Sequence, residues 1–237
     1  MFDEFSTFKN NSENLAKSGG RALGAIISKI HTNKSIGFKT FEKMYLSGVA
    51  PILDYCSGVW GCDKHHNIES VQHRAMRYFL GVHRFTPILA IQGECGWLSS
   101  FSRHQLNFIR LWNRLLTMSD DRLTKKIVLW DLEQLNDKNW SHKIESLLES
   151  LDMAVFFRNR IVCNLNTVEE KLRQDFINGW KERICNVPKL RTYQTVKNNF
   201  QTEKYVTLDI PKYHRSILAQ FRCGVLPIRI ETGRFRG

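Results

Sequence analysis

The sequence predicts a mainly α-helical protein, an irregular multi-helix bundle with little or no sheet. Only 5 prolines occur in 237 residues, and long stretches rich in Leu, Ile, Lys, Arg and Asn contain neither Gly nor Pro. Such stretches favour helices over many short strands bounded by turns. The apolar share of 42% is enough to build a core, and the charged share of 24% is ordinary for a folded chain.

The first helix is expected to run from a cap at Asn10–Glu13 to about Ile30, after a lead-in over residues 1–10 that is loose or a strand remnant. Gly19, Gly20 and Gly24 weaken this helix, because each glycine costs about 1 kcal/mol in a helix relative to alanine. These glycines either allow another backbone to approach closely or are simply tolerated.

Further helices are expected wherever apolar residues recur at helical spacing. The clearest spans 102–118, where Phe108, Leu111, Trp112, Leu115 and Leu116 follow an i, i+3, i+4, i+7, i+8 pattern. Others are expected from Phe38 to a glycine stop at Gly61 (with a kink at Pro51), and over 67–80 (ended by Gly81), 124–131, 141–151, 168–186 and 213–223. Residues 81–98 are expected to form a loop with a short helix, and Tyr205–Leu208 to be extended.

The net charge of +12 is unevenly distributed along the sequence. Residues 1–63 carry +1, 64–126 carry +6, 127–170 carry −4 and 171–237 carry +9, so two basic blocks flank an acidic one. Basic blocks suit the nucleic-acid backbone, where each neutralised phosphate releases a counterion. The alternative is a helical surface whose Lys and Arg side chains face solvent.

Arginines suited to phosphate contact cluster in and around the helices expected over 67–118. The spacing of Arg103, Arg110 and Arg114 places them within about 40° of one another on one helix. Arg74, Arg77 and Arg84 bring the total to six arginines within 41 residues. A guanidinium binds phosphate through two parallel hydrogen bonds and stacks on bases, although any one of these side chains could equally be solvated.

A second basic cluster lies at the end of the sequence, where Arg234 and Arg236 flank Phe235. Basic residues alternating with an aromatic ring can clamp a backbone and stack on a base. The alternative is a frayed terminus. Arg234 and Arg236 therefore join the six arginines above as candidate nucleic-acid contacts.

No motif indicates a catalytic centre. The spacing of Cys56, Cys62, His65 and His66 matches no common zinc site, and the six cysteines are expected to be reduced thiols. A turn or helix cap explains the adjacent Asp120 and Asp121 better than a two-metal site does. The sequence has no P-loop, G-x-S-x-G, H-E-x-x-H or Gly-rich dinucleotide turn. We therefore expect no metal, no cofactor and no enzyme activity of the chain itself.

The expected location is intracellular, in the cytoplasm or nucleus. No stretch approaches the roughly 20 apolar residues that span a bilayer, so no membrane partner is expected. The acidic start Met1–Glu4 lacks the apolar region of a signal peptide.

Four stretches, read in order, carry a family resemblance: Leu15–Gly24, Val49–Gly61, Ile68–Arg77 and Leu226–Phe235. Together they resemble the region that follows the polymerase palm in reverse transcriptases of non-LTR (LINE-type) retrotransposons. Ile68–Arg77 is similar to that family's pattern I-x-x-V-Q-x-R-A-x-R. The middle stretches are fairly specific, whereas 119–187 resembles the family only weakly.

The resemblance implies a thumb-like helical region over 1–63, a basic helical linker over 64–118, and a helical C-terminal region over 119–237 that ends before an absent zinc knuckle. In the family these parts hold template RNA and the primer duplex. The implied partners are therefore RNA or an RNA–DNA duplex, and the palm domain of a full-length enzyme. The palm's Tyr-x-Asp-Asp motif is absent, so the chain is not expected to polymerise DNA.

Two alternatives remain open at this stage. The chain is either a degenerate element product without biochemical role, or a helical protein-interaction module that prefers an acidic partner. The first predicts an apolar thumb face near Tyr45 and Trp60 that is exposed where the palm would normally cover it.

Overall fold

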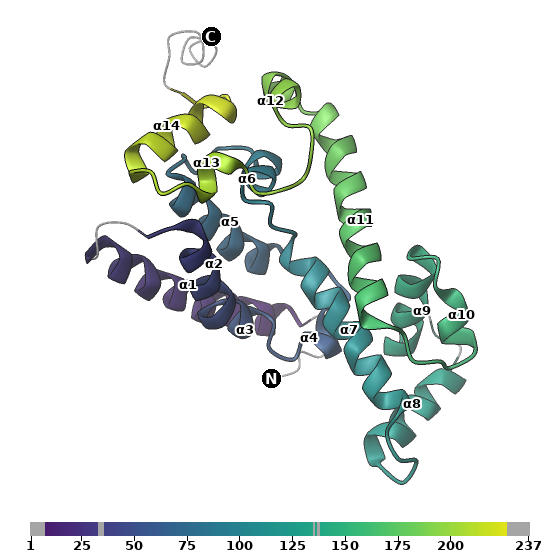
Figure 1. Ribbon diagram of the computed structural model, residues 1–237. Coiled ribbons are helices and arrows are strands. Elements are labelled where there is room, and N and C mark those ends of the chain that lie inside the picture. The colour runs from purple at the N-terminus through teal and green to yellow at the C-terminus, as the bar shows by residue number, and fades with distance from the viewer. Residues whose placement is uncertain (1–7, 33–35, 135, 137, 227–237) are drawn as a thin grey trace. The chain divides into compact units, whose positions relative to one another are not determined.

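The predicted mainly α-helical architecture is confirmed by the computed structural model, which describes residues 8–32, 36–134, 136 and 138–226. Helices follow one another along these residues, and none of them forms a strand (Figure 1). In chain order the helices are α1 (Lys9–Thr32), α2 (Phe38–Gly48), α3 (Ala50–Leu53), α4 (Ser57–Trp60), α5 (His66–Leu80), α6 (Ile88–Cys95), α7 (Ser100–Leu116), α8 (Leu123–Glu133), α9 (Trp140–Ser150), α10 (Ala154–Arg158), α11 (Leu165–Cys185), the 3-10 helix η1 (Pro188–Leu190), α12 (Arg191–Val196), α13 (Lys204–Thr207) and α14 (Lys212–Arg222).

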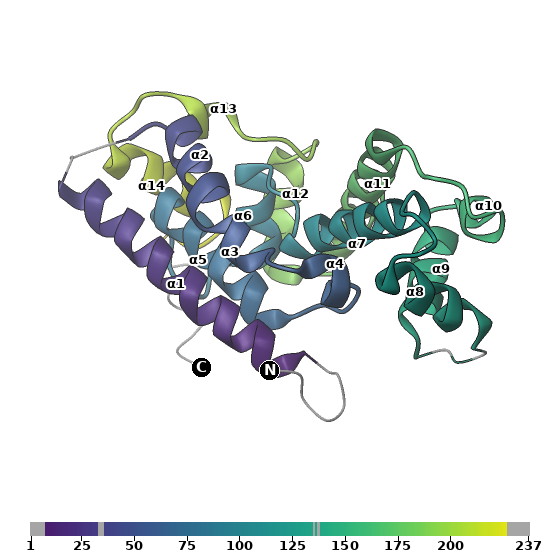
Figure 2. The same ribbon diagram turned by 90° about the horizontal axis from the view of Figure 1, so that it is seen from below.

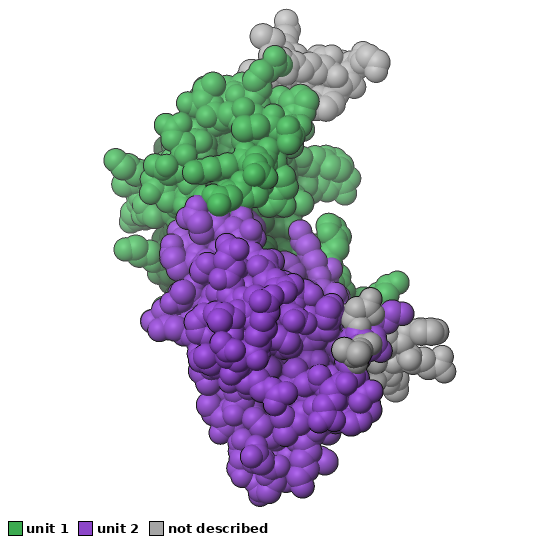
Figure 3. Space-filling view, turned by 90° about the vertical axis from the view of Figure 1, so that its right-hand side faces the viewer, with its two compact units in different colours: residues 1–53, 66–99, 177–237 green, residues 54–65, 100–176 purple. Residues whose placement is uncertain are grey.

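The chain forms two compact units, each assembled from segments that are distant in sequence (Figure 3). Unit 1 comprises Met1–Leu53, His66–Ser99 and Ile177–Gly237, and unit 2 comprises Asp54–His65 and Ser100–Phe176. The regions expected from the sequence, in contrast, are consecutive. Helix α11 contributes its first half to unit 2 and its second half to unit 1.

Unit 1 is built around aromatic side chains from α2, α5 and the segment after α6. Phe41 stacks on Phe79, with ring centroids 5.0 Å apart, and the Tyr45 ring lies 4.8 Å from that of Trp97. Phe38, Phe41 and Tyr45 recur at i, i+3 and i+7, so α2 turns one apolar face to this core. Burial of such a side chain contributes about 1.5–3 kcal/mol.

The core of unit 2 lies between α7, α9 and the start of α11. Trp112 is fully buried on α7, packed in one apolar cluster with Ile144 and Leu148 of α9. Asn113 fixes the segment that leads into α11, because its side-chain amide donates to the carbonyl oxygen of Cys163 (2.8 Å) and accepts from the Cys163 amide (2.9 Å). The strong apolar spacing of the helix expected over 102–118 therefore marks the centre of this unit.

Two local expectations are wrong. Pro51 was expected to kink a helix, but α2 ends at Gly48 and Pro51 lies in the first turn of the separate helix α3, where its missing N–H costs no hydrogen bond. Tyr205–Leu208 was expected to be extended, but α13 begins at Lys204. A short β-prone segment with no neighbouring strand has no ladder to join, and the Tyr205 hydroxyl instead donates to buried Glu94 (2.6 Å).

The apolar thumb face expected to be exposed near Tyr45 and Trp60 is corrected for these two rings, which are buried, whereas their neighbours Leu46, Tyr55 and Val59 are exposed. Tyr45 lies in the core of unit 1, and Trp60 is buried in unit 2, where its indole donates to the carbonyl oxygen of Tyr55 (3.0 Å). The Tyr45 and Trp60 rings each pack within their own unit.

No described helix is both long and apolar enough to cross a lipid bilayer.

Candidate nucleic-acid interface

The whole net charge of the protein belongs to unit 1. The segments of this unit carry 22 Lys and Arg against 10 Asp and Glu, whereas those of unit 2 carry 13 of each. Unit 1 therefore has a charge of +12 and unit 2 a charge of zero. Because a polyanion is attracted by the summed field of a surface, a phosphate-binding site is expected on unit 1.

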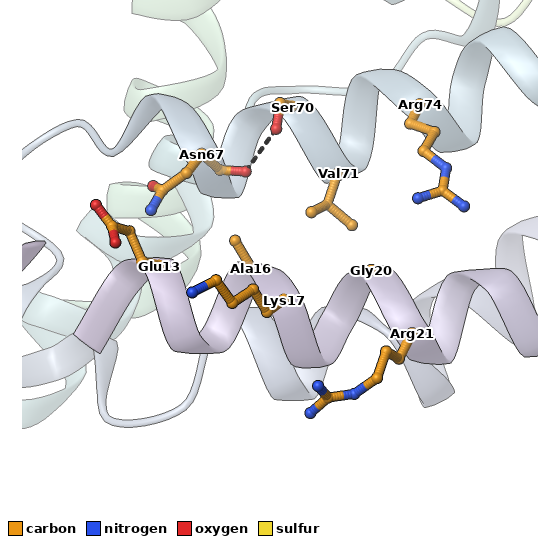
Figure 4. A pocket seen from close by; sticks show the side chains of 9 residues that line it. All are labelled: Glu13, Ala16, Lys17, Gly20, Arg21, Asn67, Ser70, Val71 and Arg74. Atoms are coloured by element: carbon orange, nitrogen blue, oxygen red, sulfur yellow. Dashed lines mark hydrogen bonds between the residues drawn. The ribbon is translucent and has the colours of Figure 1, made fainter. Parts of the chain in front are cut away.

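A shallow groove of about 650 Å³ runs between α1 and α5 on this unit. The two helices lie side by side in both ribbon views (Figures 1 and 2). Figure 4 shows the side chains that line the groove, which are Glu13, Ala16, Lys17, Gly20, Arg21, Asn67, Ser70, Val71 and Arg74. The floor is small and apolar, and the polar and charged groups stand along the two helices.

Three cations border the groove. Lys17 and Arg21 are one turn apart on α1, and Arg74 points from α5 toward α1, while Arg21 extends from the outer edge of its helix (Figure 4). All three side chains are exposed, and in the described part of the chain no carboxylate forms an ion pair with any of them. Their charges are therefore available to a ligand.

Small residues and one polar contact keep the groove open. The Asn67 amide donates to the Ser12 hydroxyl (3.1 Å) and ties the start of α5 to α1. A side chain added at Gly20 would meet no atom within 4 Å, and one added at Gly24 would meet only the Arg74 guanidinium, at 3.9 Å. The alanine and glycines of α1 thus leave room that a larger residue would fill, and Arg74 reaches over this room.

Arg74 is the one sequence-predicted arginine that lines this groove. Arg77, on the same helix, is half-buried, and one of its terminal nitrogens donates to the Thr86 carbonyl oxygen (3.1 Å). Burial lowers the pKa of Arg77 below its usual range. Arg84 lies exposed in the following loop, with its guanidinium carbon 4.6 Å above the ring of exposed Phe85. Arg77 therefore stabilises the loop after α5, to which it donates a hydrogen bond, whereas the Arg84 guanidinium stacks on a ring and is exposed to solvent.

The three arginines of α7 belong to unit 2 and differ from one another. Arg103 binds the Asp54 carboxylate through two nitrogens, at 3.0 and 3.3 Å. Arg110 and Arg114 are exposed, and Arg110 donates to the side chain of Asn107 (2.9 Å). The six arginines predicted to act together are thus divided between the units, and Arg103 already has a carboxylate partner. Arg234 and Arg236 lie outside the described residues.

Lys17 and Arg21 were missed at the sequence level. Their signal is present, since a basic pair at i, i+4 brackets Gly19 and Gly20 on a helix. It becomes informative only once α5 is known to lie alongside, because an isolated helix face with two cations is usually just solvated. The groove can bind phosphate oxygens through these cations and through the second N–H of the Asn67 amide, with room for a sugar over its apolar floor. The Ser70 hydroxyl already donates to the Asn67 carbonyl oxygen (2.7 Å).

The geometry provides no metal centre among the described residues, where no group of three or more His, Cys, Asp and Glu side chains converges. Cys56 is exposed, and Cys62 donates to the Asp63 carboxylate beside it (3.4 Å). Burial together with that carboxylate raises the pKa of Cys62 to about 11, so its thiol is protonated at neutral pH.

Comparisons with protein families, with curated proteins and with solved structures found no match for this chain.

Proposed function

We propose that the protein binds the sugar-phosphate backbone of RNA or of an RNA–DNA duplex without sequence preference, through the groove between α1 and α5. The observation that carries the proposal is the presence of three exposed, unpaired cations, Lys17, Arg21 and Arg74, around a groove on the unit that holds the entire net charge. Phosphate contacts supply affinity without reading bases, and no group here is placed to read a base edge.

The role we propose is noncatalytic. The resemblance to the region after the palm of a non-LTR reverse transcriptase suggests that the chain supports template and primer for a palm carried elsewhere in the polyprotein. Leu15–Gly24 and Ile68–Arg77, two of the stretches that carry the resemblance, supply most of the groove, including Lys17, Arg21 and Arg74. Intracellular nucleic acid is the ligand that this role requires.

The test is the affinity of the full chain for an RNA–DNA duplex, measured by filter binding at several salt concentrations. The variant Lys17→Gln/Arg21→Gln/Arg74→Gln should bind at least about tenfold more weakly, and the slope of log affinity against log salt should fall by about one per lost phosphate contact. Glu13, whose carboxylate lines the same groove, repels phosphate, so Glu13→Gln should strengthen binding.

The matched control is Lys39→Gln/Lys43→Gln/Lys204→Gln, which removes three exposed charges from unit 1 without touching the groove. It should cost clearly less than the groove variant. Equal losses in the two variants would mean that only the total charge matters and that the groove is no site. An affinity of the wild-type chain that does not change with salt would contradict backbone binding altogether and favour a protein-interaction module.

A further inference from the structure

Helix α8 of unit 2 buries a lysine and leaves three large apolar side chains exposed. Its buried residue is a lysine, Lys125, only 8% exposed, whereas Leu123, Ile127 and Trp130 are 73%, 53% and 61% exposed. The Lys125 ammonium donates to the carbonyl oxygens of Leu115 (3.0 Å) and Leu116 (2.9 Å) in the last turn of α7, where a cation is favoured. The inner face of α8 is thus held by this polar contact and by Val128 and Leu132, which pack against the core of unit 2, while a second set of apolar side chains is left outside.

The exposed side chains form a single ridge. Leu123, Ile127 and Trp130 follow i, i+4 and i+7 spacing, which places them within about 60° on the helix, the arrangement of the contact positions of a coiled coil. Isolated exposed apolar residues are common, but three large ones in line on one helix mark an interaction surface.

The charges beside the ridge identify the occupant. Lys126 and Glu133 are both exposed and stand seven residues apart, so they flank the same side of the ridge near opposite ends of α8. When two such helices pack antiparallel, residues on the same flank face each other across the contact. Lys126 of each copy then meets Glu133 of the other, and Trp130 of each packs near Ile127 of the other.

We propose that α8 is the contact through which two copies of this chain associate, as an antiparallel pair related by a two-fold axis. The ridge and its flank are self-complementary, as an isologous interface requires, because each residue finds its partner in an identical surface. A partner of another kind would need a separate complementary groove, whereas a second copy needs nothing beyond α8 itself. This inference does not depend on the proposed nucleic-acid binding.

The interface is small, so the dimer is expected to be weak. Helix α8 has 11 residues, and a pair of such helices buries less than the roughly 1,200–2,000 Å² of stable interfaces. Dissociation constants in the micromolar range follow, which correspond to a transient pair at low concentration and a populated dimer at about 100 µM.

The experiment is sedimentation equilibrium of the full chain from about 1 to 200 µM, after nuclease treatment so that bound nucleic acid cannot bridge two molecules. The wild-type chain should show a monomer–dimer equilibrium, and Trp130→Glu, a change at an exposed position, should weaken association at least about tenfold. Circular dichroism of each variant verifies that its helix content is unchanged.

A charge exchange tests the antiparallel register. Lys126→Glu and Glu133→Lys should each weaken the dimer, because either change creates two like-charge contacts. The double variant Lys126→Glu/Glu133→Lys should restore the wild-type constant to within about threefold. Glu169→Lys, an exposed change on α11, is the control and should have no effect. A chain that stays monomeric at 200 µM, or charge variants as harmless as the control, would overturn the proposal.

Discussion

Asp54 determines whether the charge of Arg103 stabilises the fold or is available to a ligand. Its carboxylate accepts hydrogen bonds from Arg103 (3.0 Å) and contacts the buried His104 ring nitrogen at 2.9 Å. Burial by itself raises the pKa of Asp54, but the hydrogen bond with His104 and the charge of Arg103 outweigh it, so this pKa lies below its usual range. Arg103 is thereby committed to the fold of unit 2, whereas Lys17 and Arg74, without such partners, remain available.

We expect Asp54→Asn to destabilise the protein by about 1.5–3 kcal/mol at pH 7, the usual worth of hydrogen bonds to a charged group. Because folding lowers the pKa of this carboxyl group, its contribution is present above the unfolded pKa of about 3.9 and is lost as pH falls through the lower folded value. Urea unfolding should therefore show a difference between wild type and variant that shrinks steadily below about pH 4.

The control for this measurement is Asp175→Asn, an exposed position of the same unit, which should change stability by less than about 0.5 kcal/mol. A wild-type advantage over Asp54→Asn that persists unchanged to pH 2.5 would show that the ionised carboxylate is not what stabilises this contact.

At the scale of an element, α1 shows two adjacent glycines with opposite tasks. A side chain at Gly19 would lie 2.5 Å from Cδ2 of Leu53, a fully buried residue of α3, whereas one at Gly20 would meet nothing within 4 Å. Gly19 therefore allows α3 to pack on α1, and Gly20 leaves the groove toward α5 open. Both glycines lower the intrinsic stability of α1 as a helix. Only Gly19 offsets this cost, because it lets Leu53 of α3 pack closely against α1.

We expect Gly20→Ala to stabilise the protein by about 0.5–1 kcal/mol, since alanine restricts the unfolded chain and fits the helix without a clash. Gly19→Ala should destabilise it by about 1–3 kcal/mol, because Leu53 must move within a packed core. Urea unfolding of the two variants measures both signs. Two effects of the same sign would contradict the assignment of Gly19 to packing and Gly20 to open space.

At the scale of the whole molecule, the basic residues of one sequence block are divided between two units of different net charge. The basic stretch 64–126 contributes Arg74 and Arg84 to unit 1, but Arg103, Arg110 and Arg114 to unit 2, whose carboxylates balance its cations. A polyanion responds to the charge of a surface rather than to that of a sequence block. The arginines of α7 are therefore expected to contribute less to binding than their clustering in sequence indicated.

We expect Lys17→Gln/Arg74→Gln to reduce affinity for an RNA–DNA duplex about tenfold or more at 0.1 M salt, and Arg110→Gln/Arg114→Gln to reduce it less than about threefold. Both variants remove two exposed positive charges, so each controls for the other's change in net charge. Filter binding at a single salt concentration is sufficient. A larger loss in the α7 variant would move the interface to unit 2.

The sequence by itself determined the helical class of this protein and the position of its strongest helices. The reason is physical: a period of 3.6 in apolar residues, as in Phe108, Trp112 and Leu115, is a local property that any packing must respect. Gly81 likewise ends α5 as expected, with a φ of +69° and no space for a side chain beside Ser216.

Only the tertiary structure decided which charges act together. Lys17 and Arg74 are 57 residues apart in sequence and meet because α1 and α5 pack side by side, whereas Arg74 and Arg103 are closer in sequence and belong to different units. Whether an arginine is available or bound to a carboxylate, and whether an apolar face such as that of α8 is covered, depends on which distant segment lies beside it. Which segments lie side by side is set by contacts between residues far apart in sequence, and a local sequence pattern carries no information on those contacts.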